Sequence, residues 1–158
     1  MKCAAELMMI ARNAEDARAI EKAKEEERKR QRDAIVAKQT IKWCETVLSK
    51  YLEKCAANDP YFSKGNWSSE YDESMHFDNF WGSNRLRPLS PYYKYANGTP
   101  SFISSPDPDK ELNFSVIREY CRKYCIEVQA SYRGYMRYGL GRQSGVQLQF
   151  RLSPECFK

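Results

Sequence analysis

Residues 21–33 (EKAKEEERKRQRD) restrict the fold of this chain most strongly, because Ala23 is the only apolar residue among them. The run lies inside residues 4–57, which contain no glycine or proline and are rich in Ala, Glu, Lys and Arg. These residue types favour a helix, and the sequence NDP that follows is typical of a helix stop. The sequence therefore predicts one long helix, solvated over its charged middle, and a core built mainly from later residues.

Both ends of this predicted helix carry apolar residues at helical spacing. One stripe alternates steps of three and four residues: Ala34, Ala37, Ile41, Cys44, Leu48, Tyr51 and Cys55. Such a stripe packs on another surface, so we expect residues 34–57 to dock on the chain's own C-terminal lobe. A shorter stripe (Ala4, Leu7, Ala11, Ala14) is out of heptad phase with the first. One continuous straight coiled coil is therefore disfavoured, and contact of the N-terminal arm with a partner or a second copy is the alternative interpretation.

The remaining residues, 59–158, predict a tyrosine-rich α+β lobe. Turn formers and aromatic residues alternate over 59–109, which favours short strands between turns. Pro108 and Asp109 predict the start of a helix that runs to about Tyr124. Two strands with alternating apolar residues follow, and they predict an antiparallel hairpin: Ile126, Val128, Ala130 and Tyr132, then Val146, Leu148, Phe150 and Leu152.

We therefore predict an α+β fold in which a long charged N-terminal helix is followed by a small antiparallel sheet packed on one or two helices. The predicted domains are residues 1–58, a helical arm, and residues 59–158, the lobe. Residues 133–145 (RGYMRYGLGRQSG), with four glycines, are expected to form a long loop between the two hairpin strands.

The cysteines and the N-terminus predict a cytoplasmic protein. Four of the six cysteines (Cys44, Cys55, Cys121, Cys125) lie on apolar stripes of predicted helices, so we expect reduced, buried thiols rather than disulfides. No stretch approaches the roughly 18 consecutive apolar residues of a membrane span. Glu6 and Arg12 interrupt the apolar part of the N-terminus, which is unlike a secretory signal.

The residues that carry common chemistries are scarce. His76 is the only histidine, and there is no CxxC pair, GxSxG elbow, Walker loop or dinucleotide fingerprint. Asp72, Glu73 and Asp78 stand near His76, but their spacing matches no metal motif. We therefore predict no enzyme, no catalytic residue, no metal site and no cofactor.

The predicted partner-binding residues are basic and aromatic, and they lie in the arginine-rich C-terminal segment. The expected loop interleaves glycines with Arg133, Tyr135, Arg137, Tyr138 and Arg142, and the preceding helix adds Arg118, Arg122 and Lys123. Arginine binds phosphate or carboxylate with paired donors, and tyrosine offers a stacking face. The same residue types suit a protein-binding hot spot. An ordinary solvated hairpin tip is the alternative interpretation.

Three phrases of the sequence follow one another in a characteristic order: AEDARAIEKAKEEERKRQRDAIVAKQ, WCETVLSKYLEKCAAND and YCRKYCIEVQASY…VQLQFRLS. This layout resembles small accessory proteins of phages and prophages, some of which are anti-CRISPR inhibitors. The resemblance implies a protein that inhibits a host nucleic-acid-directed defence effector by stoichiometric binding in the host cytosol. Its partner would be a protein or a ribonucleoprotein. The chain is basic, with a net charge of +5, so it departs from inhibitors that mimic DNA.

Three other functions fit the same sequence. A small nucleic-acid-binding module would use the basic C-terminal segment, and its affinity would fall steeply with salt. A sponge for a nucleotide signal would use the arginines and tyrosines among the glycines. A structural or assembly protein would form a homo-oligomer through the N-terminal helix.

Overall fold

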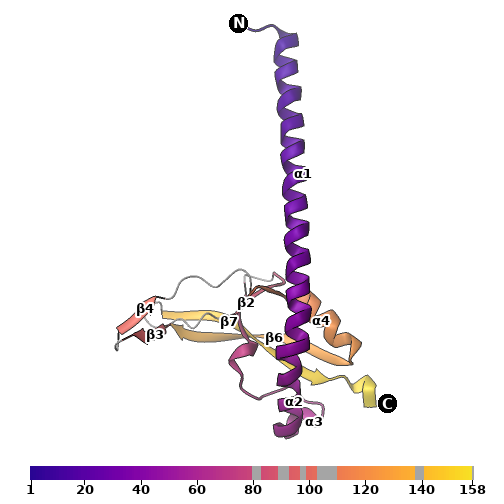
Figure 1. The fold of residues 1–158 in the computed structure, drawn as a ribbon, viewed down its shortest axis with the longest axis vertical. Helices are drawn as coiled ribbons and strands as arrows, with labels where there is room; N and C mark the ends of the chain where they lie inside the picture. Colours follow the sequence, from indigo (N-terminus) through magenta and orange to yellow (C-terminus); the bar gives the residue numbers. More distant parts are fainter. Residues whose placement is uncertain (80–82, 89–92, 97–98, 103–109, 138–140, 158) are drawn as a thin grey trace. The chain divides into compact units, whose positions relative to one another are not determined.

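The computed structural model describes residues 1–158 except 80–82, 89–92, 97–98, 103–109, 138–140 and 158 (Figure 1). Side chains are described for all of these except residues 73, 78–79, 88, 93–96, 99–102, 133–137, 141–144 and 156–157. The contacts divide the chain into two units, Met1–Ile35 and Val36–Lys158. This division falls inside the long helix, whereas the predicted domains are an arm of residues 1–58, with 34–57 docking on the lobe, and the lobe itself.

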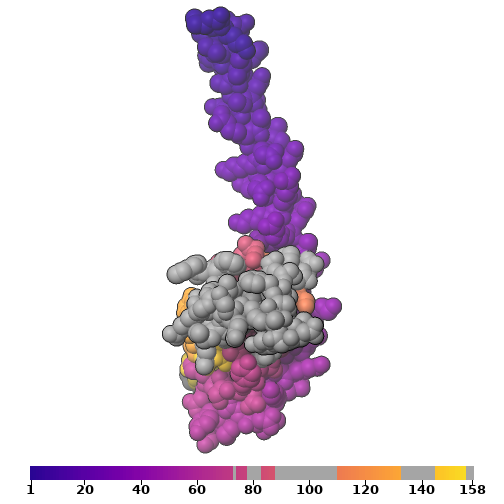
Figure 2. Space-filling view, turned by 90° about the vertical axis from the view of Figure 1, so that its left-hand side faces the viewer, coloured from indigo at the N-terminus to yellow at the C-terminus, as the bar shows by residue number. Residues whose placement is uncertain are grey.

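The predicted N-terminal helix is confirmed. Helix α1 (Ala4–Trp43) continues through a π-helical turn, η1 (Cys44–Leu48), into α2 (Ser49–Asn58). Within the first unit every residue is exposed, and Figure 2 shows the atoms of this unit in view along its length. Exposed ion pairs join Arg28 to Glu25 (3.4 Å) and Arg30 to Glu27 (3.6 Å). Such pairs contribute only a few tenths of a kcal/mol each.

The second unit contains a mixed arrangement of helices and antiparallel strands, which confirms the α+β class. The five-stranded sheet has the order β5-β2-β1-β7-β6, and a separate hairpin pairs β3 with β4. The strands are β1 (His76–Asn79), β2 (Arg85–Pro88), β3 (Tyr93–Ala96), β4 (Thr99–Phe102), β5 (Leu112–Asn113), β6 (Ile126–Arg137) and β7 (Gly141–Leu152). The helices beside them are α3 (Pro60–Ser63), η2 (Glu73–Met75), α4 (Phe114–Lys123) and η4 (Pro154–Phe157).

The core of this unit forms where the C-terminal part of the long helix and α4 cover one face of the sheet. Its buried helical residues are Cys44, Leu48, Tyr51, Cys55, Ile117 and Cys121, and its buried strand residues include Phe77, Leu86, Val146, Leu148 and Phe150. The Tyr51 ring meets the Phe150 ring edge-on at 6.0 Å between centroids. Of the predicted stripe, Ala34 and Ile41 are exposed, and Thr40 is fully buried beside them.

Two elements differ from the sequence prediction. Helix α4 begins at Phe114 instead of about residue 109, because Leu112 pairs with Leu86 in the sheet and the Asn113 side chain caps the helix by accepting from the Val116 N–H (3.2 Å). The expected loop 133–145 is mostly strand. Strands β6 and β7 pair without a break from Ile126↔Leu152 to Arg137↔Gly141, so Gly134, Gly141 and Gly145 stand within the ladder.

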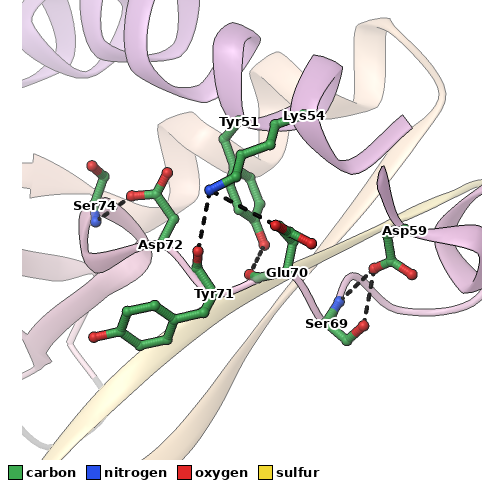
Figure 3. Close-up of polar contacts among 8 residues, drawn as sticks. All are labelled: Tyr51, Lys54, Asp59, Ser69, Glu70, Tyr71, Asp72 and Ser74. Atoms are coloured by element: carbon green, nitrogen blue, oxygen red, sulfur yellow. Dashed lines mark hydrogen bonds and ion pairs between the residues drawn. The ribbon is translucent and has the colours of Figure 1, made fainter. Parts of the chain in front are cut away.

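Asp59 joins the end of the long helix to the segment that leads into the sheet (Figure 3). Its N–H donates to the Cys55 carbonyl and ends α2. One carboxylate oxygen accepts from the N–H groups of Tyr61 (3.0 Å) and Phe62 (3.2 Å), and the other accepts from the Ser69 N–H (2.9 Å) and hydroxyl (3.0 Å). The hydrogen bonds from Ser69, followed by those from Phe62 and Tyr61, lower the pKa of this buried carboxyl.

The stability of the protein is expected to depend on Leu48 and not on Leu7, although both lie in the long helix. Leu48 is 1% exposed in the core and Leu7 is 53% exposed. Leu48→Ala therefore lowers the free energy of unfolding by about 2–5 kcal/mol, whereas Leu7→Ala changes it by less than about 0.5 kcal/mol. Chemical denaturation of the two variants measures this difference. Equal losses would mean that the first unit is packed as tightly as the second.

Asp59 is expected to stabilise the fold in its ionised form. Replacement by Asn leaves buried donors without their carboxylate, so Asp59→Asn costs about 1–3 kcal/mol at neutral pH. Because the folded pKa lies below the unfolded value of about 3.9, this stabilisation is complete above that value and is lost as the pH falls through the folded pKa. Urea unfolding at several pH values should show the gap between wild type and variant closing below about pH 4. A gap that stays constant in acid would contradict this assignment.

Candidate binding groove beside α4 and β6

A groove of about 510 Å³ lies beside α4 and the first residues of β6. We call it the α4–β6 groove. Two arginines of one helix line it together with an aromatic ring and the main chain of an edge strand. Its lining residues are Trp67, Arg118, Arg122, Cys125, Ile126, Glu127, Val128, Ser153 and Glu155.

Helix α4 holds the two arginines because its opposite side is fixed in the core. Ile117 and Cys121 are buried, while Arg118 and Arg122 are exposed. Residues four apart lie on one side of a helix, so both guanidinium groups line the same groove. The Arg118 guanidinium lies 4.7 Å from the centre of the Phe114 ring, and Arg122 is 3.9 Å from Glu119 in a highly exposed pair. Exposed pairs of this kind are weak, so both guanidinium groups remain available to an anion.

A residue in the left-handed backbone conformation turns the chain from α4 into β6. Cys125 has φ 58°, a conformation that is unfavourable for a residue with a side chain. Its N–H donates to the Arg122 carbonyl (3.2 Å) and its carbonyl accepts from Ser153 (2.8 Å). These bonds set the first pair of the β6–β7 ladder directly beside the arginines. Cys125 is exposed, so the prediction that it is a buried thiol is wrong.

The other wall of the groove is built around Trp67. The Arg151 guanidinium lies over the Trp67 ring at 4.5 Å and also pairs with Glu127 across the β6–β7 ladder. Arg151 thus neutralises one of the two carboxylates that line the groove. Glu155 is exposed at its rim. The groove offers two exposed guanidinium groups beside Trp67, which suits a ligand that carries a phosphate or carboxylate group.

The structure brings together only some of the residues that the sequence singled out. Arg118 and Arg122 share the groove, and Lys123, also exposed, ends α4 beside it. Arg133, Tyr135, Arg137 and Arg142 lie in the paired strands, but their side chains are outside the described part of the chain, as is all of Tyr138. Trp67, Glu127 and Arg151 were missed because tertiary contacts bring them together. The β6–β7 register places Glu127 opposite Arg151, and the hydrogen bonds of Ser68 to Phe150 hold Trp67 beside them.

A second, apolar groove of about 410 Å³ lies between η1–α2 and α4. Its apolar lining comprises Cys44, Leu48, Leu52, Tyr120, Cys121, Tyr124 and Ile126, with Ser49 and Glu53 as its polar members. Burial raises the pKa of Cys44 to about 12 and that of Cys121 to about 12, and it raises the pKa of Tyr120 to about 12. These thiols are therefore neutral at physiological pH and poor nucleophiles.

The described residues contain no group of three or more His, Cys, Asp or Glu side chains placed to hold a metal ion. They also contain no helix with the length and apolar content needed to cross a membrane. No protein-family model, curated protein or solved structure matches the chain.

The cysteines are expected to differ sharply in reactivity. Cys3 is exposed, whereas Cys44 and Cys121 are buried thiols whose raised pKa removes the reactive thiolate. Brief treatment with iodoacetamide at pH 8 should alkylate Cys3 and leave Cys44 and Cys121 unmodified until denaturant is added. Peptide mass spectrometry measures this order. Alkylation of all three at one rate would show that the core around η1 and α4 opens readily.

Proposed function

We propose that the chain is a non-enzymatic binding protein that inhibits a nucleic-acid-directed host defence effector by forming a stoichiometric complex with it. The exposed arginine pair of the α4–β6 groove carries this proposal. The resemblance of the sequence layout to anti-CRISPR-type accessory proteins directs it to this class of effector. The partner is a protein or a ribonucleoprotein that presents phosphate or carboxylate groups.

The groove supports binding because its donors are positioned in advance. Arg118 and Arg122 project from a helix that is anchored by Ile117 and Cys121, so little backbone order is lost when they engage a ligand. Each guanidinium can donate two parallel hydrogen bonds to a phosphate or carboxylate. Trp67 adds an indole surface to the same groove, and tryptophan and arginine are typical of binding hot spots.

Removal of the arginine pair should weaken the complex without unfolding the protein. Arg118→Ala/Arg122→Ala is expected to lower affinity at least about tenfold, because charged hydrogen bonds contribute about 1.5–3 kcal/mol each. Lys38→Ala/Lys42→Ala is the matched control, since it removes two exposed charges at the same spacing from another helix of the unit. The tagged wild type and both variants are used to capture partners from a lysate of the source organism, with and without nuclease, and affinity is measured on the captured effector.

Retention of one dominant effector after nuclease treatment, and its loss with the α4 variant alone, would support the proposal. An effector that binds the two variants equally would remove the groove from the mechanism. An absence of any effector in the nuclease-treated sample would contradict inhibition by a protein contact.

A free-standing nucleic-acid-binding module is the second candidate, favoured by the indole of Trp67 beside two arginines. This function predicts that the purified protein binds naked RNA or DNA, and that the logarithm of the affinity falls linearly with the logarithm of the salt concentration. Fluorescence anisotropy with a labelled oligonucleotide distinguishes the two functions, because an inhibitor of a protein effector needs no such affinity.

A further inference from the structure

Strand β6 is the last strand of its sheet and is unusually long for an edge strand. It spans Ile126–Arg137, 12 residues, and pairs with β7 on one side. The residues that the structure describes include no strand on its other side. Typical strands have about five or six residues, and proteins normally shorten, bend or cover their edges because unpaired main-chain groups attract other strands.

The hydrogen bonds of β7 show which main-chain groups of β6 face outward. Phe150 directs both its N–H and its carbonyl to Ser68, on the side of β7 away from β6. Val128 stands opposite Phe150 and forms a non-hydrogen-bonded pair with it, so the N–H and carbonyl of Val128 point away from β7. The Ser153 N–H donates to the Cys125 carbonyl, so the odd-numbered Cys125 faces β7 while the even-numbered Val128 faces away from it. In an unbroken ladder the even-numbered residues of β6, among them Ala130 and Tyr132, thus present their N–H and carbonyl groups to the outer edge.

This alternation limits how a second copy of β6 can pair with the edge. Two antiparallel copies must place even-numbered residues opposite even-numbered residues, because only these carry outward groups. Within residues 126–137 two registers satisfy this rule over eleven residues, one centred on Ser131 and the other centred on Tyr132. In the second register Tyr132 faces its own copy. In that register Ala130 stands opposite Gly134 and Val128 opposite Met136, so the edge would gain about ten hydrogen bonds.

The register centred on Ser131 places Glu127 opposite Tyr135, whereas the register centred on Tyr132 is complementary in charge. It places Glu127 of each copy opposite Arg137 of the other, at both ends of the paired segment. Directly opposed residues of unlike charge stabilise an antiparallel pair. Tyr132 lies on the two-fold axis and is 69% exposed, so its ring is available to a second ring. A single strand thus supplies its own complement in length, main-chain pattern and charge.

We propose that two copies of the chain associate through antiparallel pairing of β6 with β6, about a two-fold axis at Tyr132. The pairing joins the two sheets into one continuous sheet. This inference is independent of the proposed function, because it requires neither the arginine pair nor an effector.

Proline at position 130 tests the main-chain contacts. Ala130→Pro removes an outward N–H and leaves the β7 ladder intact, since proline is tolerated on the open side of an edge strand. Ala130→Ser keeps the N–H and is the matched control. Analytical ultracentrifugation of the full chain from micromolar to submillimolar concentration should show dimers for the wild type and Ala130→Ser, and monomers for Ala130→Pro. A monomeric wild type, or a folded Ala130→Pro protein that still dimerises, would overturn the proposal.

A cysteine at position 132 tests the register without depending on the fold of the proline variant. Hydrogen-bonded partners in antiparallel strands have Cα atoms about 5.5 Å apart, which suits a disulfide. Tyr132→Cys should therefore form a 132–132 cross-link under mild oxidation, identified by peptide mass spectrometry, and Tyr71→Cys, at another exposed tyrosine (67%), should not. Equal cross-linking at both positions, or none at 132, would contradict the pairing.

Discussion

The packing of Tyr51 against Phe150 fixes the arrangement on which the rest of the second unit depends. The ring of Tyr51 meets Phe150 near the C-terminal end of β7, and its hydroxyl donates to the Glu70 carbonyl at 2.8 Å. One side chain therefore attaches the long helix both to the sheet and to the segment that precedes β1 (Figure 3). Burial raises the pKa of this phenol, so the hydroxyl remains a donor throughout the physiological range.

Helix α4 belongs to the same core, and this gives the α4–β6 groove its geometry. Cys121 and Cys44 are buried in one cluster, which fixes one side of α4 against the π-helical turn. The opposite side then presents Arg118 and Arg122 beside the start of β6. A π-helical turn adds a residue to one turn of a helix, and here it falls where the stripe of the long helix enters the core.

The groove and the open edge of β6 share a short piece of main chain. Ile126 and Val128 line the groove, and they are also the first even-numbered residues of the edge. In the register centred on Tyr132, Val128 is covered by the second copy. A ligand that reaches the base of the groove would therefore compete with self-association, whereas a ligand held only by the arginines would not.

Periodicity in the sequence predicted the long helix, the α+β class and the two hairpin strands, because each depends on local propensity or on one buried face. It failed where a distant partner decides the structure. Leu112 joins a strand because Leu86 is opposite it. Residues 133–137 remain in the ladder although Gly134 among them favours a loop. Within the candidate site, the sequence alone predicted that Arg118 and Arg122 lie four residues apart on a helix. It could not predict the contact of Trp67 with Arg151, because 84 positions of sequence separate them.

The long helix changes character at Val36: it is solvated before this residue and anchored in the core after it. Residue-resolved amide hydrogen exchange measured by NMR on the full chain tests this change most directly. We expect rapid exchange throughout residues 4–35 and strong protection around Leu48, Tyr51 and Cys55, with the change between them. Uniform protection from Ala4 to Asn58 would contradict it, because the first unit would then be held by contacts as strong as those of the core.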